Sequence, residues 1–214
     1  MAAGKFNKVP VLSGRNRDEG TVFTPSSVAS EADIRTLVTS VLIPEVLDDA
    51  VFQGLLDAYP NDPALGSPFG TGNNTFGKDP EWKRGAAIFG DWKYTSTSRH
   101  LLRAAAAQGL DAWGYLWLPP TGDLGATHGA DTSMVFRNDD PPANVLSSAL
   151  ALQRGYIRFI SDLNPLNDDG TPWPKYADEP AVMKFDTNVS TVQTDDYRSD
   201  GIEWVLTHVD AWKK

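Results

Sequence analysis

The sequence predicts an α/β fold with a mostly parallel sheet, and three observations support this. Two short runs, Val9 to Ser13 and "AWGYLWL" from Ala112, are nearly continuous in apolar residues, as expected of strands buried on both faces. Segments with helical periodicity lie between and after these runs. No internal repeat points to a solenoid or a propeller. Strands separated by helices favour a parallel sheet with covering helices.

The first third of the chain is expected to hold two helices and a long loop. Ser30 is a suitable N-cap for "EADIRTLVTSVL", whose apolar residues recur at helical spacing and stop before Pro44. A second amphipathic helix is expected from about Leu47 to Tyr59. The segment Pro60 to Asn74 holds three prolines and three glycines, which predicts a loop.

The remainder of the chain adds helices and one more strand. A helical region is expected from Pro80 to Gly109, with a bend near Gly90 and Gly109 as its C-cap. "VMKFD" from Val182 predicts a short strand, and a last helix is expected from Asp195 to about Val209. A further helix is expected after Asn144 as its cap, with inward residues Val145, Leu146, Leu150, Leu152, Tyr156, Ile157 and Ile160. Two convincing strands and one short strand are too few for a complete parallel sheet.

Composition limits the classes of partner. The 214 residues carry a formal net charge of -9, which argues against nucleic acid or an anionic membrane surface as a partner. The sequence contains no cysteine, so disulfides, thiolate catalysis and cysteine metal sites are excluded. No apolar stretch approaches the ~20 residues needed to span a bilayer, and "MAAGKFNK" lacks the apolar core of a signal peptide. Taken alone, the chain reads as cytosolic, with export left open.

The candidate catalytic residues follow the two buried strands. Glu19 stands in "RDEG" after the first strand, and His128 stands in "GATHGAD" after the second. Because sites in open α/β sheets lie beyond the carboxyl ends of the strands, we expect the two side chains to meet. Glu19 would then accept a hydrogen bond from Nδ1 of His128 and leave Nε2 free to take a proton. The alternative interpretations are a solvated turn and a surface histidine.

Metal binding is not expected at this pair. The sequence contains no HExxH motif and no cluster of histidine and acidic residues that would complete a zinc site. We therefore predict neither a metal nor an organic cofactor. His100 and His208 are interpreted as helix-surface or helix-end residues. The aromatic residues Trp113, Tyr115 and Trp117 are interpreted as sheet core rather than as a ligand site.

Several separated motifs resemble one known family. "VPVLSGRNRDEGTVF", "YPNDPALGSPFGTG", "KRGAAIFGDWKYTSTSR", "GATHGADTSMVF" and "TDDYRSDGI" are similar, in this order, to the C-terminal part of the type-B carboxylesterase and lipase family of α/β-hydrolases. The fungal lipase branch is the most similar. The resemblance covers nearly the whole chain and implies an incomplete central sheet with flanking helices.

The resemblance also implies roles for individual residues. The acid of a Ser-Glu-His triad matches Glu19, and the triad histidine matches His128, followed by Gly129 and then Asp131 as a support for its loop. A structural salt bridge of the family matches Asp91 in "FGDWK" and Arg198 in "DDYRS". The acid precedes the histidine along the chain, as in α/β-hydrolases.

The chain departs from the family in lacking a nucleophile. No G-x-S-x-G elbow and no glycine-rich oxyanion loop occur in the 214 residues. Ser13, Ser67 and Ser133 do not fit the elbow pattern, and Ser67 and Ser133 are interpreted as loop hydroxyls. Residues 1–214 are therefore expected to be the C-terminal portion of a single hydrolase domain whose N-terminal half, with the elbow, is absent. A truncated reading frame, a split protein and a chain that has lost catalysis remain open.

The expected function is that of a serine carboxylesterase or lipase. Its substrates would be carboxylic esters and acylglycerols, and the full-length enzyme would be secreted. This chain alone is expected to be inactive, with the missing N-terminal half as its partner. The alternative is a binding or adhesion module with the same fold and no catalysis, or an inactive fragment.

Overall fold

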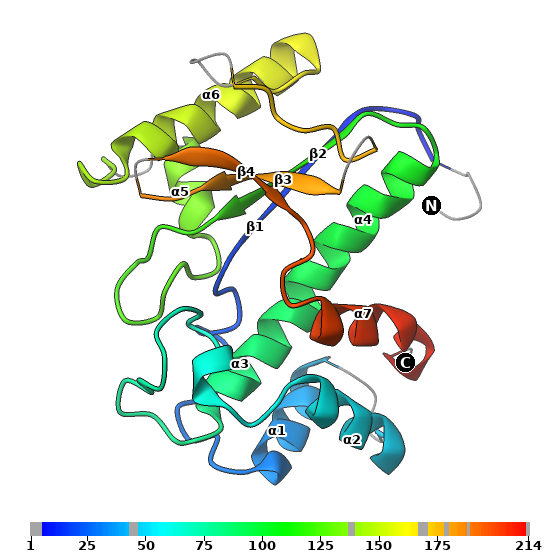
Figure 1. The fold of residues 1–214 in the computed structure, drawn as a ribbon, viewed down its shortest axis with the longest axis vertical. Helices are drawn as coiled ribbons and strands as arrows, with labels where there is room; N and C mark the ends of the chain where they lie inside the picture. Colours follow the sequence, from blue (N-terminus) through cyan, green and yellow to red (C-terminus); the bar gives the residue numbers. More distant parts are fainter. Residues whose placement is uncertain are drawn as a thin grey trace. The chain divides into compact units, whose positions relative to one another are not determined.

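The computed structural model describes residues 6–42, 47–136, 140–166, 171–177, 180–187 and 189–212. Their contacts separate into two compact units. The described residues of Met1–Asn16, Ser98–Pro119 and Gly129–Tyr197 form the sheet unit, whose elements are labelled in Figure 1. The described residues of Arg17–Thr97, Pro120–His128 and Arg198–Lys214 form the helical unit.

The sheet unit is built on four strands in the order β1-β2-β3-β4 (Figure 1). They are β1 (Val11–Asn16), β2 (Ala112–Trp117), β3 (Ala181–Phe185) and β4 (Ser190–Thr194). The first three strands pair in parallel, and β4 pairs with β3 in antiparallel orientation. The expected mostly parallel sheet is therefore confirmed.

Helices cover both faces of this sheet, as Figure 1 shows for α4 (Ser96–Ala107) and α6 (Leu146–Asp162). Side chains alternate between the faces along β2. Ala112 and Leu116 pack with Leu102 of α4. On the opposite face, Trp113 lies edge-on to Phe159 of α6, with ring centroids 5.9 Å apart. The short helix α5 (Ala130–Phe136) packs against α6. Trp113, Tyr115 and Trp117 are all buried, so their interpretation as core is confirmed.

Strand β1 differs from the prediction at both ends. It was expected over Val9–Ser13, but its ladder pairs Val11 with Ala112 and continues to Asn16 opposite Trp117. The sequence after Ser13 looks like a charged loop, yet Arg15 and Asn16 are each only 2% exposed. Hydrogen bonding to a buried neighbouring strand therefore overrides the polar character of these residues.

One strand of the sheet unit was not predicted, and one expected helix cap is wrong. Strand β4 was missed because its five residues, "STVQT", are mostly polar and lie at a sheet edge. Helix α6 begins at Leu146 after Val145, and no side chain caps it, so Asn144 is not its cap.

The inward face of α6 also differs from the expected face. Val145 and Leu152 are buried, but Leu146, Ile157 and Ile160 are exposed, the last two at 58% and 76%. The face that packs inward carries Leu152 and Phe159 together with the small residues Ser148, Ala149 and Gly155. A Cβ on Gly155 would lie only 2.6 Å from the Trp173 ring, so the helix approaches that ring too closely for larger side chains. Apolar residues thus occupy two sides of α6, and among the described residues one of these sides is exposed.

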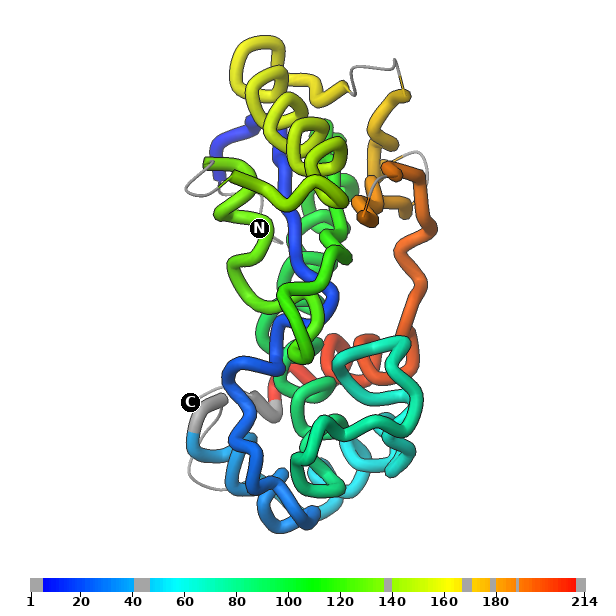
Figure 2. Tube along the Cα trace, turned by 90° about the vertical axis from the view of Figure 1, so that its left-hand side faces the viewer, coloured from blue at the N-terminus to red at the C-terminus, as the bar shows by residue number. Residues whose placement is uncertain are grey.

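The described part of the helical unit contains four α-helices, α1 (Glu31–Leu37), α2 (Asp49–Ala58), α3 (Trp82–Gly90) and α7 (Ser199–Thr207). Short helical turns occupy Val38–Leu42, Pro63–Leu65, Asp91–Thr95 and Val209–Trp212. The tube in Figure 2 shows α7, in red, beside α2, in cyan, and these two helices contact each other. Their buried side chains join those of α1 and α3 in one core.

Most helix signals in this unit are confirmed. Ser30 caps α1 in a capping box with Asp33. The bend expected near Gly90 is a π-helical turn over Asp91–Thr95, between α3 and α4. The end of the first helix near Pro44 lies outside the described residues. Helix α7 begins at Ser199 rather than Asp195, because Arg198 adopts a left-handed conformation with φ of 50°. Among the described helices, none combines the length and apolar character that crossing a membrane requires.

Candidate active site

Glu19 and His128 meet in the helical unit. Oε2 of Glu19 lies 2.6 Å from Nδ1 of His128, which satisfies the expected hydrogen-bond distance. The Glu19 side chain is 5% exposed, whereas the His128 side chain is 44% exposed. With Glu19 ionised, its carboxylate can only accept a hydrogen bond, and Nδ1 of His128 is then the donor. The acid is therefore enclosed, and the imidazole remains accessible.

Aromatic rings pack against the imidazole. The Tyr94 ring lies 4.5 Å from the His128 ring, centroid to centroid, and the Phe23 ring lies at 5.3 Å. Burial, reinforced by the negative charge of Glu19, raises the pKa of the Tyr94 hydroxyl, so this neighbour stays neutral. Tyr94 comes from the π-helical turn after α3, and π turns often occur at functional sites. Sequence reasoning missed both rings, because no local motif relates them to His128.

Gly20 fixes the loop that carries Glu19 against α3. A Cβ added to Gly20 would lie 2.0 Å from the carbonyl oxygen of Ala86 and 2.7 Å from the amide nitrogen of Gly90. No side chain fits this gap, so the backbone after Glu19 lies directly on the helix. Close packing against α3 thus explains why a glycine stands at this position of "DEG", whatever the role of Glu19.

Substituting Gly20 with alanine is expected to destabilise the chain by about 1–3 kcal/mol, because the helix backbone must move away. Gly85→Ala is a matched control in the same region. A Cβ at Gly85 would meet its nearest atom at 3.4 Å, an ordinary contact, and alanine favours a helix by about 0.8–1.0 kcal/mol over glycine. Urea denaturation followed by tryptophan fluorescence measures both. Equal midpoints for the two variants would contradict this packing account.

Asp131 and Gly129 lie in the sheet unit. The Asp131 carboxylate accepts hydrogen bonds from Asn16 Nδ2 at 2.8 Å, the Tyr115 hydroxyl at 2.6 Å and the Thr132 amide at 2.9 Å. Burial and the adjacent Asp131 charge hold the pKa of Tyr115 well above its usual value. Gly129 has φ of 79°, a left-handed conformation that suits glycine. Asp131 therefore has the contacts of a structural anchor, three residues after His128 in the chain.

The expected pair of Asp91 and Arg198 is present in the helical unit. Nε of Arg198 lies 3.1 Å and 2.9 Å from the two carboxylate oxygens of Asp91. The Asp91 side chain is 1% exposed and the Arg198 side chain 19%. The Arg198 guanidinium also lies 3.9 Å from the centroid of the Phe69 ring, a cation–π contact.

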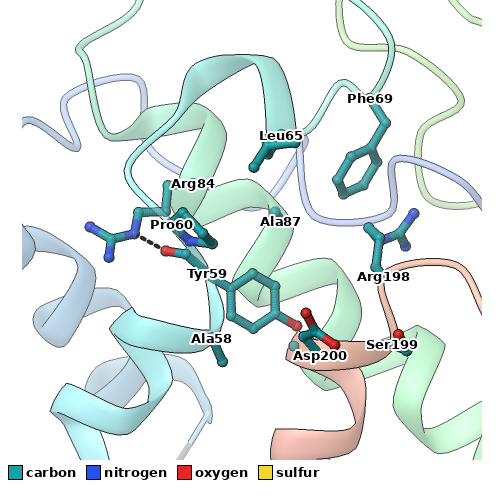
Figure 3. Close-up of a pocket in the computed structure, with 12 residues that line it drawn as sticks. Ala58, Tyr59, Pro60, Leu65, Phe69, Arg84, Ala87, Arg198, Ser199 and Asp200 are labelled. Atoms are coloured by element: carbon teal, nitrogen blue, oxygen red, sulfur yellow. Dashed lines mark hydrogen bonds between the residues drawn. The ribbon is translucent and has the colours of Figure 1, made fainter.

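Arg198 lines a pocket of about 360 Å³ in the same unit. Figure 3 shows the ring of Tyr59 and the side chains of Phe69 and Arg198 around it, and Arg84 donating from Nε to the Tyr59 carbonyl oxygen. Neither Glu19 nor His128 is among its lining residues. The volume of this pocket is therefore not a reason to identify it as the candidate active site.

The three serines considered in the sequence have other partners. Ser13 Oγ lies 3.0 Å from Ser98 Oγ, Ser67 donates to Asp18, and Ser133 donates to the Ala130 carbonyl oxygen. These contacts are those of structural hydroxyls. Within the described ranges, no group of three or more histidine, cysteine or acidic residues lies together as metal ligands would.

Similar proteins cover nearly the full length of this chain. No family model matches it. Secreted lipase 1 of Botryotinia fuckeliana is 30% identical over 99% of this chain, and the match spans 38% of that lipase. Secreted triacylglycerol lipase LIP1 of Gibberella zeae is 31% identical over 99% of this chain and 36% of its own length. The chain thus spans less than two fifths of these relatives.

The fold agrees with these relatives. Aspergillus niger EstA superposes with a TM-score of 0.79 at 18% identity, over 100% of this chain and 42% of EstA. This match supports the fold class, and the sequence matches support the relationship to lipases. This chain is therefore related to fungal lipases along nearly its full length, and it has the α/β-hydrolase fold.

Proposed function

We propose that this chain supplies the acid and the histidine of a Ser-Glu-His ester hydrolase. The observation that carries the proposal is the 2.6 Å contact between Glu19 Oε2 and His128 Nδ1, with the acid enclosed and the imidazole accessible. An enclosed carboxylate bound to Nδ1 fixes the tautomer in which Nε2 is the proton acceptor.

The proposed reaction follows from this arrangement. Nε2 of His128 takes the proton of a serine hydroxyl as its Oγ attacks the ester carbonyl carbon. The same nitrogen then gives the proton to the departing alcohol, which leaves an acyl-serine. Water attacks the acyl carbon, His128 accepts its proton and returns it to the serine, and the carboxylic acid is released. Glu19 stays ionised throughout and stabilises the imidazolium.

The proposed substrates are carboxylic esters, including acylglycerols. This class rests on the lipase names of the relatives, one of which is a triacylglycerol lipase. Both of these relatives are named as secreted, so we propose secretion for the enzyme to which this chain contributes. The proposal involves no metal and no organic cofactor.

The nucleophile and the oxyanion donors are proposed to come from a preceding segment of the same hydrolase, with residues 1–214 as the C-terminal portion of one domain. Two surfaces of the sheet unit support this. Among the described residues, no strand pairs with the outer edge of β1, and an open edge favours pairing with further chain. The exposed residues Leu146, Ile157 and Ile160 of α6, with Leu163 directly after the helix, also form an apolar side that a companion segment would cover.

The proposal is tested by assaying a short-chain aryl ester with residues 1–214 alone and with the same residues joined to their upstream coding segment. We expect no enzymatic rate from the chain alone, because each missing oxyanion donor costs roughly 100- to 1000-fold. Turnover is expected from the joined protein. If the joined protein carries a G-x-S-x-G elbow and still shows no esterase activity, the binding-module alternative is correct instead.

A further inference from the structure

The carboxylate of Asp18, the residue directly before Glu19, is buried in the helical unit, and both of its oxygens accept hydrogen bonds. It is 0% exposed. Its Oδ1 accepts from the Ser67 hydroxyl at 3.0 Å and the Phe69 amide at 2.8 Å. Its Oδ2 accepts from the Ala126 amide at 2.9 Å and from Arg17 Nε at 3.1 Å. A buried carboxylate is tolerated when several donors satisfy it, so Asp18 links the segments that provide those donors.

One of these segments is the loop that carries the histidine. Ala126 precedes His128 by two residues, and its amide and carbonyl both bind Asp18. The Asp18 amide donates to the Ala126 carbonyl oxygen at 2.9 Å, while the Ala126 amide donates to the Asp18 carboxylate. The Thr21 hydroxyl adds a second link, because it donates to the carbonyl oxygens of Asp18 and Leu124 at 2.9 and 2.8 Å. The acid loop and the histidine loop are thus joined immediately beside the Glu19–His128 contact.

Gly125 shows how closely the two loops fit. A Cβ at Gly125 would lie 2.3 Å from Asp18 Oδ2, and its φ of 76° is in the left-handed region. Any larger residue here would displace the Asp18 carboxylate. The small residues before His128 therefore leave space for this carboxylate.

We propose that Asp18 is a positioning residue for the catalytic pair. Its carboxylate holds Ala126, and therefore the short segment to His128, at the distance at which Glu19 reaches Nδ1. Asp18 does not exchange a proton with His128. It fixes the position of one loop relative to the other, and a displacement of 1 Å in such a pair can cost about 100-fold in rate. This inference rests on the proposed role of Glu19 and His128.

The test uses the Nδ1 proton of His128, observed by NMR as a low-field resonance in residues 1–214. The unsubstituted chain is expected to show this resonance. Asp18→Asn is expected to lose it although Glu19 is intact, because an asparagine side chain cannot accept from Ser67, Phe69 and Ala126 together while its amide group faces a donor. Retention of the resonance in Asp18→Asn would overturn the proposal.

Two control variants separate positioning from general stability. Asp195→Asn removes another buried carboxylate, one bound to Arg15 and Arg99 in the sheet unit, and should keep the resonance. Ser67→Ala removes one donor to Asp18 but leaves its bond to Ala126, and should also keep it. Loss of the resonance in Asp195→Asn would show that the resonance reports on overall stability, and loss in Ser67→Ala would show that it reports on the loop of Ser67. Either result would refute the proposal.

Two further measurements keep the test decisive. If Asp18→Asn does not fold, hydrogen exchange of the unsubstituted chain replaces it. The Ala126 and Phe69 amides are expected to be protected together, since both donate to Asp18, and rapid exchange of Ala126 alone would contradict the proposal. Glu19→Gln should abolish the low-field resonance. If it does not, the Glu19–His128 pair itself is in error, and that failure belongs to the proposed function rather than to Asp18.

Discussion

Replacing His128 with alanine is expected to lower kcat of the complete hydrolase by about 10⁴-fold or more, since the proposed acceptor of the serine proton is removed. Glu19→Gln should cost about 10⁴-fold, because the amide no longer fixes the tautomer or stabilises the imidazolium. The measurement is steady-state hydrolysis of an aryl ester by the protein joined to its upstream segment. KM should change little, because neither residue is proposed to bind the ground-state substrate.

The matched control is His100→Ala. His100 is an exposed histidine on α4, so its removal should leave kcat within a few-fold of the unsubstituted value. Equal rates for His128→Ala and His100→Ala would show that His128 is not the base. A large loss for His128→Ala with full activity in Glu19→Gln would remove Glu19 from the triad and leave its contact as a packing feature.

The second large effect concerns the Asp91–Arg198 pair. Removing Arg198 leaves the nearly inaccessible Asp91 carboxylate without its main partner, and such a loss costs roughly 3–5 kcal/mol. Asp91→Ala should cost less, because Arg198 is partly exposed and stays in contact with Phe69. A double-mutant cycle by urea denaturation measures the coupling free energy of the two side chains.

The exposed pair of Arg35 and Asp49 is the control for this cycle. Its Nη2–Oδ1 distance is 2.7 Å, but the Asp49 side chain is 96% exposed. A pair of this kind contributes under about 1 kcal/mol. The same small coupling for both pairs would refute the structural role of Asp91 and Arg198.

Much of the candidate site could be predicted because its chemistry follows strand ends. Two apolar runs predicted neighbouring parallel strands, β1 and β2 pair as such, and the residues expected to meet after them do so at 2.6 Å. The resemblance to the family also predicted the pairing of Asp91 with Arg198. These residues lie more than 100 positions apart, and no local sequence pattern connects them. The role of each residue in catalysis remains a prediction.

The missed features depend on contacts between distant residues. Arg15 appears in a charged run, yet it is buried against Asp195, which also binds Arg99 and accepts from the Tyr176 hydroxyl. No property of one segment reveals that its charges will be enclosed by another. The outward apolar side of α6 was misassigned for a related reason. Helical spacing identifies apolar residues, but it does not say which of two apolar sides the rest of the unit covers.

The acid and the histidine are proposed to come from this chain, and the nucleophile from outside residues 1–214. The most direct measurement is labelling of the joined protein with a fluorophosphonate, which reacts with activated serines, followed by mass spectrometry of the labelled peptide. We expect one labelled serine in the upstream segment and loss of labelling in His128→Ala. A labelled serine within residues 1–214 that depends on His128 would contradict the account, because the chain would then contain its own nucleophile.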